Sequence, residues 1–266
     1  MPKVKVNDIK IEYSIDGAGE PLLLIAGLGY NRWCWHRVIP ELSKTFQVIT
    51  FDNRGVGGTD RTPGPYSSEL LAKDTADLLD TLGFKKAHIA GISMGGFIAQ
   101  ALVIQRPDLF KSLILMSTGF GGARQVPAEA EVMSQLINPT LSVRDRCKLS
   151  CAPDFSEREK DFFESWVKYR TENPVNIEGY RSQLAVGLKL MYDENSFESA
   201  LSSVQIPTLI LYGELDRVIP AGNGALLQNA IPNSQLVLIP EVSHFLPFEC
   251  PQIIVSQICS FKAHIG

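Results

Sequence analysis

The serine at the centre of Gly91-Ile92-Ser93-Met94-Gly95 stands in a pattern that is typical of a catalytic nucleophile. An apolar run at 87–90 precedes it, and a helical pattern of apolar residues follows it. Strand, tight turn, serine and helix is the order that the G-x-S-x-G motif requires. A serine at so sharp a turn has a strained backbone, and side chains at the positions of Gly91 and Gly95 would collide. The helix that follows points free N–H groups at the serine, which favours an oxyanion.

A serine hydroxyl needs a general base, and the base needs an acid that orients it. With a nucleophile of this kind, the two partners follow later strands in the order acid, then histidine. His244 comes directly after the last apolar run, 236–239, so its loop can reach the serine turn. The other three histidines lie in an early helical pattern, inside a strand and near the end of the chain: His36, His88 and His264. We therefore predict His244 as the base.

Asp216 is the predicted acid, because it follows the next-to-last apolar run at the corresponding end of a strand. Glu214, two residues earlier, is the alternative. The segment after the apolar run 113–116 carries no carboxylate that could take this role, which favours Asp216. Asp52 is expected to brace its own loop through Arg54 instead of taking part in the reaction.

An oxyanion in a tetrahedral intermediate needs two N–H donors. The amide of Met94, directly after the nucleophile, is one predicted donor. The other is the amide of Leu28, in the loop that follows the apolar run 21–26. Gly27 and Gly29 let this loop turn towards the serine, and both are expected to touch the substrate. A plain strand-to-helix turn without this role remains the alternative.

The composition is that of an ordinary globular protein and excludes several functional classes. The chain has 266 residues, of which 45% are hydrophobic and 20% are charged, with a formal net charge of −4. Without a basic patch, nucleic acid is not an expected partner. No apolar stretch approaches the about 20 residues that span a membrane, so a cytoplasmic protein is expected. The five cysteines show no metal-binding spacing and are expected to be free thiols.

Apolar runs of strand length alternate with helical patterns along most of the chain. Helices are predicted at 33–42, 67–82 and 251–262. This alternation predicts a parallel α/β sheet that is flanked by helices. The predicted strands, of which the first two form a hairpin, are 4–6, 9–13, 21–26, 46–51, 87–90, 113–116, 208–212 and 236–239.

Between about 123 and 203 the sequence contains no clear apolar run of strand length. Helical patterns at 159–169 and 179–191 fill this stretch, and aromatic residues are frequent in it. An insertion after a strand of a parallel sheet leaves from the edge where ligands bind. We therefore expect a helical cap over Ser93, in which Phe163 and Trp166 contact the substrate. Aromatic residues at helical spacing are also typical of a core, so that alternative stays open.

Together these segments resemble the α/β-hydrolase superfamily, in its capped, soluble serine-hydrolase branch. The similarity rests on the loop 27–30, on Asp52-Asn53-Arg54-Gly55-Val56-Gly57, on the serine turn, on 213–216 and on His244. It implies a mostly parallel eight-stranded sheet, with a core formed by 1–122 and 204–266 and a helical cap formed by 123–203. Two positions depart from the pattern. Ala26-Gly27 replaces a usual His-Gly pair, which leaves the bracing of the loop open, and Ser243 replaces a common glycine.

Within this branch the chain is similar to enol-lactonases, carboxylesterases and C–C bond hydrolases. The resemblance implies cleavage of an ester or lactone of a small, largely apolar molecule, through an acyl-enzyme on Ser93. No metal and no cofactor is implied. C–C bond hydrolysis and perhydrolysis use the same three residues and remain alternatives, as does a ligand receptor built on this fold. The expected partner is the small-molecule substrate, without nucleic acid or membrane, and a homodimer is left open.

Overall fold

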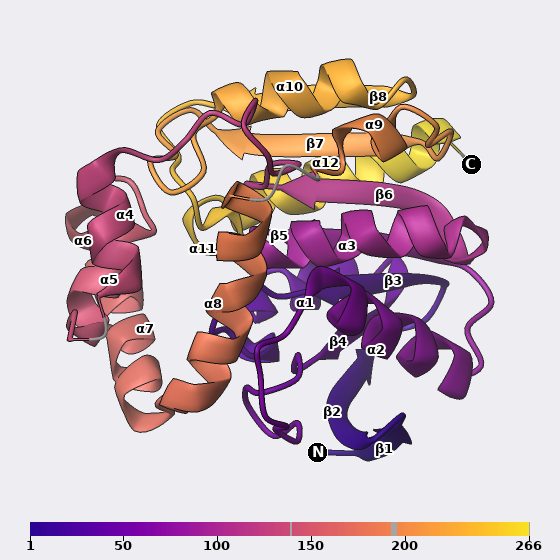
Figure 1. Ribbon diagram of the computed structural model, residues 1–266, viewed down its shortest axis with the longest axis horizontal. Helices are drawn as coiled ribbons and strands as arrows, with labels where there is room; N and C mark the ends of the chain where they lie inside the picture. The colour runs from indigo at the N-terminus through magenta and orange to yellow at the C-terminus, as the bar shows by residue number, and fades with distance from the viewer. Residues whose placement is uncertain (139, 193–195, 266) are drawn as a thin grey trace.

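A computed structural model describes residues 1–138, 140–192 and 196–265. The expected cap, 123–203, therefore includes four positions, 139 and 193–195, that lie outside the described residues. Within the described part, eight strands form one sheet in the order β1-β2-β4-β3-β5-β6-β7-β8. The β1–β2 and β2–β4 pairs are antiparallel, and every other pair is parallel. The predicted α/β architecture is confirmed (Figure 1).

The strands follow the predicted apolar runs closely, because the central ones are buried on both faces of the sheet. Successive side chains of a strand point to opposite faces, so Leu23 joins one hydrophobic core and Leu22 the other. The strands are β1 Lys3–Val6, β2 Ile9–Asp16, β3 Glu20–Ile25, β4 Phe46–Phe51, β5 Ala87–Ile92, β6 Phe110–Met116, β7 Thr208–Gly213 and β8 Ser234–Ile239.

Helices cover both faces of the sheet. One face carries α2 (Ser68–Thr81), α3 (Met94–Gln105) and α10 (Gly222–Ala230), whose apolar residues belong to one core. The other carries the 3₁₀ helix η1 (Arg32–Trp35), α1 (Ile39–Leu42), α11 (Leu246–Glu249) and α12 (Pro251–Ile265). A second short 3₁₀ helix, η2 (Pro107–Leu109), leads into β6. The single helix predicted at 33–42 is thus wrong, because the chain there divides into η1 and α1.

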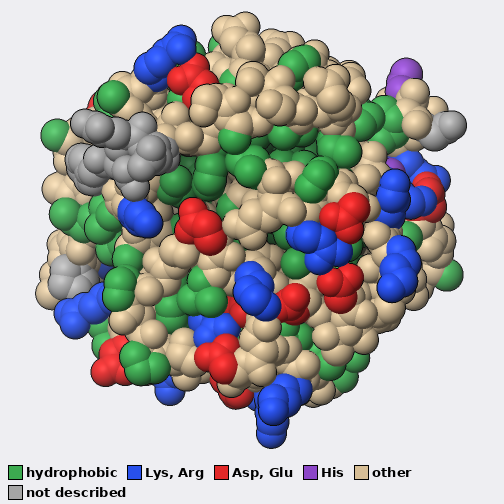
Figure 2. All heavy atoms as spheres, turned by 45° about the vertical axis from the view of Figure 1, so that its right-hand side comes forward, with side chains coloured by type: hydrophobic (Ala, Val, Ile, Leu, Met, Phe, Trp, Pro, Cys, Tyr) green, Lys and Arg blue, Asp and Glu red, His purple; other side chains and the backbone are tan. Residues whose placement is uncertain are grey.

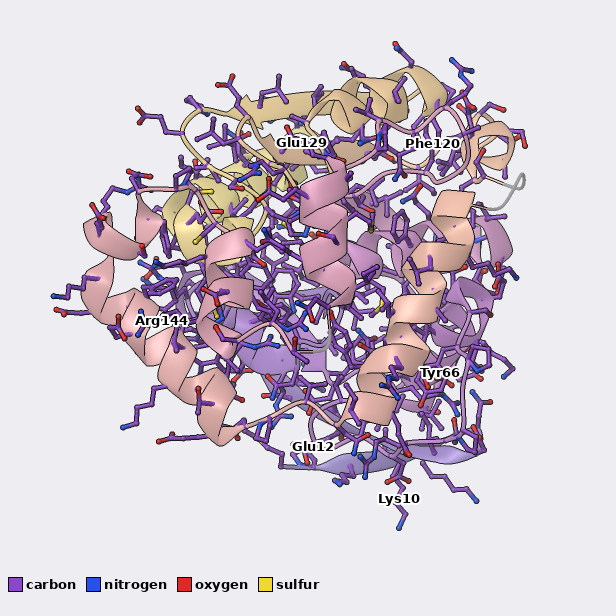
Figure 3. The ribbon with its side chains drawn as sticks, turned by 60° about the vertical axis from the view of Figure 1, so that its left-hand side comes forward. Lys10, Glu12, Tyr66, Phe120, Glu129 and Arg144 are labelled. Carbon is purple, nitrogen blue, oxygen red and sulfur yellow. The ribbon has the colours of Figure 1, made fainter. Side chains whose placement is uncertain are left out.

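Apart from α9, which packs on α3 and α10, the helices of the segment between β6 and β7 lie beyond the carboxyl ends of the strands. Figure 1 shows α4, α5, α6 and α7 grouped beside the sheet, with α8 running between this group and the core. Figure 3 looks at this segment from outside, and α4 begins there beside the labelled Glu129. The inserted helices are α4 Ala130–Ile137, α5 Val143–Leu149, α6 Phe155–Arg158, α7 Lys160–Glu172, α8 Ile177–Tyr192 and α9 Glu198–Leu201.

The loop after β4 is braced differently from the prediction. Asp52 binds Arg32, accepting hydrogen bonds of 2.8 Å from its backbone N–H and 2.9 Å from its guanidinium. Arg54 turns away from Asp52 and pairs with Asp74 of α2 at 2.7 Å and with Asp8 at 2.8 Å. The expected Asp52–Arg54 brace is therefore wrong. Asp52 and Arg54 instead tie this loop to three other segments, namely η1, α2 and the turn that carries Asp8.

Figure 2 shows how charged side chains are distributed over one face of the molecule. On the face shown in Figure 2, basic and acidic side chains are interspersed instead of gathered by sign. Among the described residues, no helix combines the length and the apolar character that crossing a membrane requires. These observations agree with the small negative net charge of −4.

Candidate active site

Ser93 sits at a strained turn between β5 and α3. Its φ of 55° and ψ of −120° lie in a region that side-chain-bearing residues rarely adopt. A Cβ atom on Gly91 would lie 2.2 Å from the Gly95 carbonyl oxygen, and one on Gly95 would lie 2.1 Å from that of Ile25. Glycine is therefore required at both positions. The turn is held by a hydrogen bond of 2.9 Å from the Ser93 N–H to the Met116 carbonyl.

The loops after β7 and β8 bring Asp216 and His244 together. His244 Nδ1 lies 2.8 Å from Asp216 Oδ2, and both side chains are buried. The other carboxylate oxygen, Oδ1, accepts hydrogen bonds of 2.8 and 2.9 Å from the Val218 and Ile219 amides. The aspartate is thus fixed at both oxygens and presents one of them to the imidazole. Glu214, the alternative acid, is exposed to solvent.

A half-buried carboxylate that sequence reasoning missed holds the loop of His244. Glu249, on α11, accepts hydrogen bonds from the amides of Ser243 and Phe245, the two neighbours of His244, at 3.1 to 3.2 Å. It also accepts one of 2.7 Å from the Ala152 amide, which belongs to the insertion. Burial raises the pKa of Glu249 to about 7, although the three N–H donors oppose this rise. Its position five residues after the histidine was the only available signal in the sequence.

The loop after β3 lies directly against the serine. A Cβ atom on Gly27 would lie 3.4 Å from Ser93 Cβ and 3.3 Å from the Ile92 carbonyl oxygen, so a side chain here would be in close contact with the serine turn. The loop closes as a turn through a hydrogen bond of 3.2 Å from the Tyr30 N–H to the Gly27 carbonyl. Leu28, the predicted second donor, is inside this turn. Met94 is the first residue of α3, where an amide has no acceptor within the helix.

Gly29 has a different position from the one predicted. Its N–H donates a hydrogen bond of 2.9 Å to Oε1 of Gln183 on α8, a buried side chain that sequence reasoning did not single out. Its amide is therefore engaged by the protein. Gly27, in contrast, lines the cavity at Ser93.

A cavity of about 120 Å³ opens at Ser93 and His244. On one side, loop and helix residues of the core line this cavity. On the other side, residues of α4, α5, α7 and α8 in the insertion line it. Apart from Arg146 and Arg170, the insertion contributes mostly apolar side chains. The residues that line the cavity are Gly27, Leu28, Tyr30, Ser93, Met94, Phe97, Met133, Leu136, Ile137, Arg146, Leu149, Ser150, Arg170, Tyr180, Gln183, Leu184, Gly187, Leu188, Val218, Ile219, His244 and Phe245.

Phe163 and Trp166 lie outside the set of residues that line this cavity. Both are fully buried on α7 and belong to the core on the α12 face of the sheet. Trp166 stacks on Phe245 with ring centroids 5.5 Å apart and meets Phe248 edge to face at 4.9 Å. Trp166 thus packs on Phe245, the neighbour of His244, and Phe163 packs on Trp166.

The remaining histidines and cysteines are placed away from the cavity. His88 is buried in β5, where Nδ1 lies 2.8 Å from Ser112 Oγ, and burial lowers its pKa. The five cysteines are unpaired thiols. Among the described residues, no group of three or more histidines, cysteines and carboxylates is arranged as a metal site.

Comparisons with known proteins bear on the family and the fold of this chain. A family model described as alpha/beta hydrolase fold matches residues 20–251. A putative non-heme bromoperoxidase, BpoC, from Mycobacterium tuberculosis is 30% identical over 97% of this chain and 99% of that protein. A 2-hydroxy-6-oxononadienedioate/2-hydroxy-6-oxononatrienedioate hydrolase from Pseudomonas putida is 28% identical over 97% and 93%. The crystal structure of the enol-lactonase from Burkholderia xenovorans LB400 is similar with a TM-score of 0.83, 25% identity, and coverage of 98% and 100%.

Proposed function

The chain belongs to the α/β-hydrolase fold family, and on this premise we propose that it is a serine hydrolase that cleaves an ester or lactone of a small, largely apolar molecule. One observation carries the proposal. The Asp216–His244 pair, with its 2.8 Å contact, opens on the same cavity as the strained Ser93. A serine, a histidine and a buried carboxylate in this arrangement have the roles of nucleophile, base and orienting acid.

In the proposed reaction Ser93 Oγ attacks the carbonyl carbon of the substrate. His244 takes the hydroxyl proton at Nε2, because Nδ1 faces Asp216. The carbonyl oxygen becomes the oxyanion, and the amides of Leu28 and Met94 stabilise it. When the intermediate collapses, His244 gives its proton to the leaving alkoxide and an acyl-enzyme remains on Ser93. Water, deprotonated by the same histidine, releases the acid.

The cavity supports a small substrate. Its volume of about 120 Å³ is below the about 300 Å³ that is usual for ligand pockets. Leucine, isoleucine and methionine side chains dominate its wall from the insertion. We propose that residues 123–203 act as a cap, since four of their helices complete the cavity above Ser93. A short acyl group fits this space better than a long one.

C–C bond hydrolysis is a second candidate, and two cations favour it. Arg146 and Arg170 line the cavity, and Arg170 lies over the Tyr30 ring at 4.1 Å. Arg146 binds neutral oxygens, among them the Tyr180 hydroxyl at 3.2 Å. The P. putida relative is named for a dicarboxylate substrate. A substrate of that kind would place a carboxylate against these cations.

Turnover by the purified protein on a substrate panel tests the proposal. The panel contains p-nitrophenyl acetate, butyrate and octanoate, a small lactone and a vinylogous diketone that carries a carboxylate. Sustained turnover of the short esters or of the lactone, lost in Ser93→Ala, is the expected result. Faster cleavage of the diketone would favour the second candidate. A single burst followed by almost no turnover would indicate a ligand receptor instead of an enzyme.

A further inference from the structure

The turn that carries the Leu28 amide can adopt two forms. Gly29, at its third position, has a φ of +67°, and Leu28 has a negative φ, so the turn is of type II. A glycine at this position also tolerates the negative φ of a type I turn, which differs by a flip of the Leu28–Gly29 peptide. That flip turns the Gly29 N–H and the Leu28 carbonyl. The Leu28 N–H belongs to the preceding peptide, so its place beside the serine depends on where the turn as a whole is held.

Gln183 makes contacts that select one form. Its Oε1 accepts the Gly29 N–H at 2.9 Å, and its Nε2 donates to the Arg54 carbonyl at 2.8 Å. The side chain is fully buried. Its orientation follows from its partners, because an N–H can only donate and a carbonyl can only accept. A flip of the Leu28–Gly29 peptide would turn the Gly29 N–H away and leave a buried acceptor without a partner.

The helix that carries Gln183 is pressed against the core around this residue. A Cβ atom on Gly179 would lie 2.1 Å from the Gly55 carbonyl oxygen, so the helix backbone touches that loop. One turn further, the Ser182 carbonyl accepts a hydrogen bond of 3.1 Å from the Tyr66 N–H. Figure 3 shows the labelled Tyr66 beside α8. This part of the insertion is thus a fixed support for the loop.

The rest of the loop has one further brace from the core. Asn53 Nδ2 donates a hydrogen bond of 3.0 Å to the Ala26 carbonyl, which fixes the start of the loop. The centre of the turn is held by Gln183. Ala26 replaces the histidine that is usual in this superfamily, and the contact with Gln183 supplies a brace at the centre of the same loop.

We propose that Gln183 is a positioning residue for the oxyanion hole, through which the insertion holds the turn, and with it the Leu28 amide, in place beside Ser93. The inference rests on the proposed function. It makes the insertion part of the apparatus that stabilises the transition state, in addition to its place in the wall of the cavity. Because one oxyanion donor contributes about 10²- to 10³-fold to kcat, its misplacement should cost about 10- to 100-fold.

The test compares Gln183→Met with Gln100→Met on p-nitrophenyl acetate. Methionine preserves the shape of the side chain and removes both hydrogen bonds. Gln100 is a matched control, since it is also fully buried and donates to two backbone carbonyls, those of Gly96 and Gly119. We expect kcat to fall about 10- to 100-fold in Gln183→Met with KM changed less than about threefold, and to change less than about threefold in Gln100→Met.

An aryl trifluoromethyl ketone gives a second readout that a structural role would not move. Ser93 Oγ adds to its carbonyl carbon, the hydroxyl proton goes to His244, and the carbonyl oxygen becomes the oxyanion of a stable adduct. Its affinity should fall in Gln183→Met by the same factor as kcat/KM, because both depend on the oxyanion donors. Equal losses in the Gln100 variant, or kcat and ketone affinity within about twofold of wild type in Gln183→Met, would overturn the inference.

Gln183→Glu covers the case in which the methionine variant does not fold. Its carboxylate still accepts from Gly29 but brings a negative charge close to the oxyanion. The ratio of variant to wild-type kcat should therefore fall as the pH rises from about 5 to about 8, through the titration of the new carboxyl. A ratio independent of pH overturns the inference. If wild type itself forms no adduct on Ser93 and turns over no ester, the proposed function fails first.

Discussion

The loops at the carboxyl ends of the strands and the inserted helices contribute to this site in different ways. At the carboxyl ends of the strands, the site depends on backbone positions where no side chain fits. Gly91 and Gly95, on either side of Ser93, are such positions. In the insertion, the cavity wall is built from leucine, isoleucine and methionine side chains that can replace one another with little change in chemistry. We therefore expect the loops at the carboxyl ends of the strands to determine which reaction occurs, and the apolar part of the insertion to determine which substrate reaches them.

The insertion is itself uneven. Helix α8 is fixed to the core around Gly179 and Gln183. Helix α4, which also lines the cavity, has Val132 as its one fully buried residue, and Ile137 is 48% exposed. Elements with few buried contacts open most easily. We therefore expect substrate to enter beside α4 and the wall from α8 to stay in place.

The largest effect on activity is expected for Ser93→Ala, in the turn after β5. Loss of the nucleophile should lower kcat by about 10⁴- to 10⁶-fold on p-nitrophenyl acetate. The free energy of unfolding should change little, because alanine is small enough for the same turn. Steady-state kinetics and urea denaturation measure the two quantities. Activity above a tenth of the wild-type value would remove Ser93 from the mechanism.

Asp216→Asn should follow, with a decrease in kcat of about 10³- to 10⁴-fold. The amide cannot hold the imidazole in the tautomer that leaves Nε2 free to accept a proton. The matched control is Glu214→Gln, on the same loop but exposed, for which a change of less than about tenfold is expected. If the control lost more activity than Asp216→Asn, the acid would be assigned wrongly.

The strained turn at Ser93 and the contact between Asp216 and His244 could be predicted because strand order and backbone sterics restrict them. A serine between two glycines and a histidine after the last strand have few alternative explanations. In contrast, the Asp52–Arg54 brace was wrong, since an arginine can reach several carboxylates and Arg54 reaches those of Asp74 and Asp8. Sequence spacing gives the distance along the chain and says nothing of such choices in space.

The insertion was predicted as helical, but its contacts with the site were not. The sequence did not decide whether Phe163 and Trp166 line the pocket or belong to the core, because aromatic side chains at helical spacing occur in both places. Their place in the core depends on how α7 packs on Phe245 and Phe248. Gln183 carried no signal at all, since a buried glutamine is recognised only when its partners on distant segments are known.

Two variants in the insertion distinguish a residue that lines the cavity, Leu184, from a residue of the hydrophobic core, Phe163. Leu184→Ala enlarges the cavity and should shift the ratio of kcat/KM for octanoate over acetate by about 10-fold, as the loss of a few buried methylene contacts predicts. Phe163→Ala should lower the free energy of unfolding by about 3–5 kcal/mol and leave this ratio within about threefold. Identical selectivity in the two variants would contradict the division of the insertion described above.

The smallest effect concerns Glu249 and the stability of the His244 loop. Its pKa of about 7 in the folded state exceeds the value of 4.5 expected when exposed, so the folded protein binds more protons between these values. Stability should therefore fall as the pH rises from about 4.5 to about 7, by about 1–3 kcal/mol relative to Glu249→Gln, which cannot titrate. Urea denaturation of both proteins at several pH values measures the difference. A wild-type stability that stays constant or rises over this pH range relative to Glu249→Gln would contradict the assignment.

Labelling with a fluorophosphonate tests the central claim most directly. The reagent phosphonylates an activated serine with loss of fluoride, so it reports the nucleophile without any assumption about the natural substrate. Mass-spectrometric mapping should find one adduct, on Ser93, with no adduct in Ser93→Ala and slower labelling in Asp216→Asn. An adduct on another residue, or a folded wild-type protein that takes no label, would contradict the proposal that Ser93 is the nucleophile of a hydrolase.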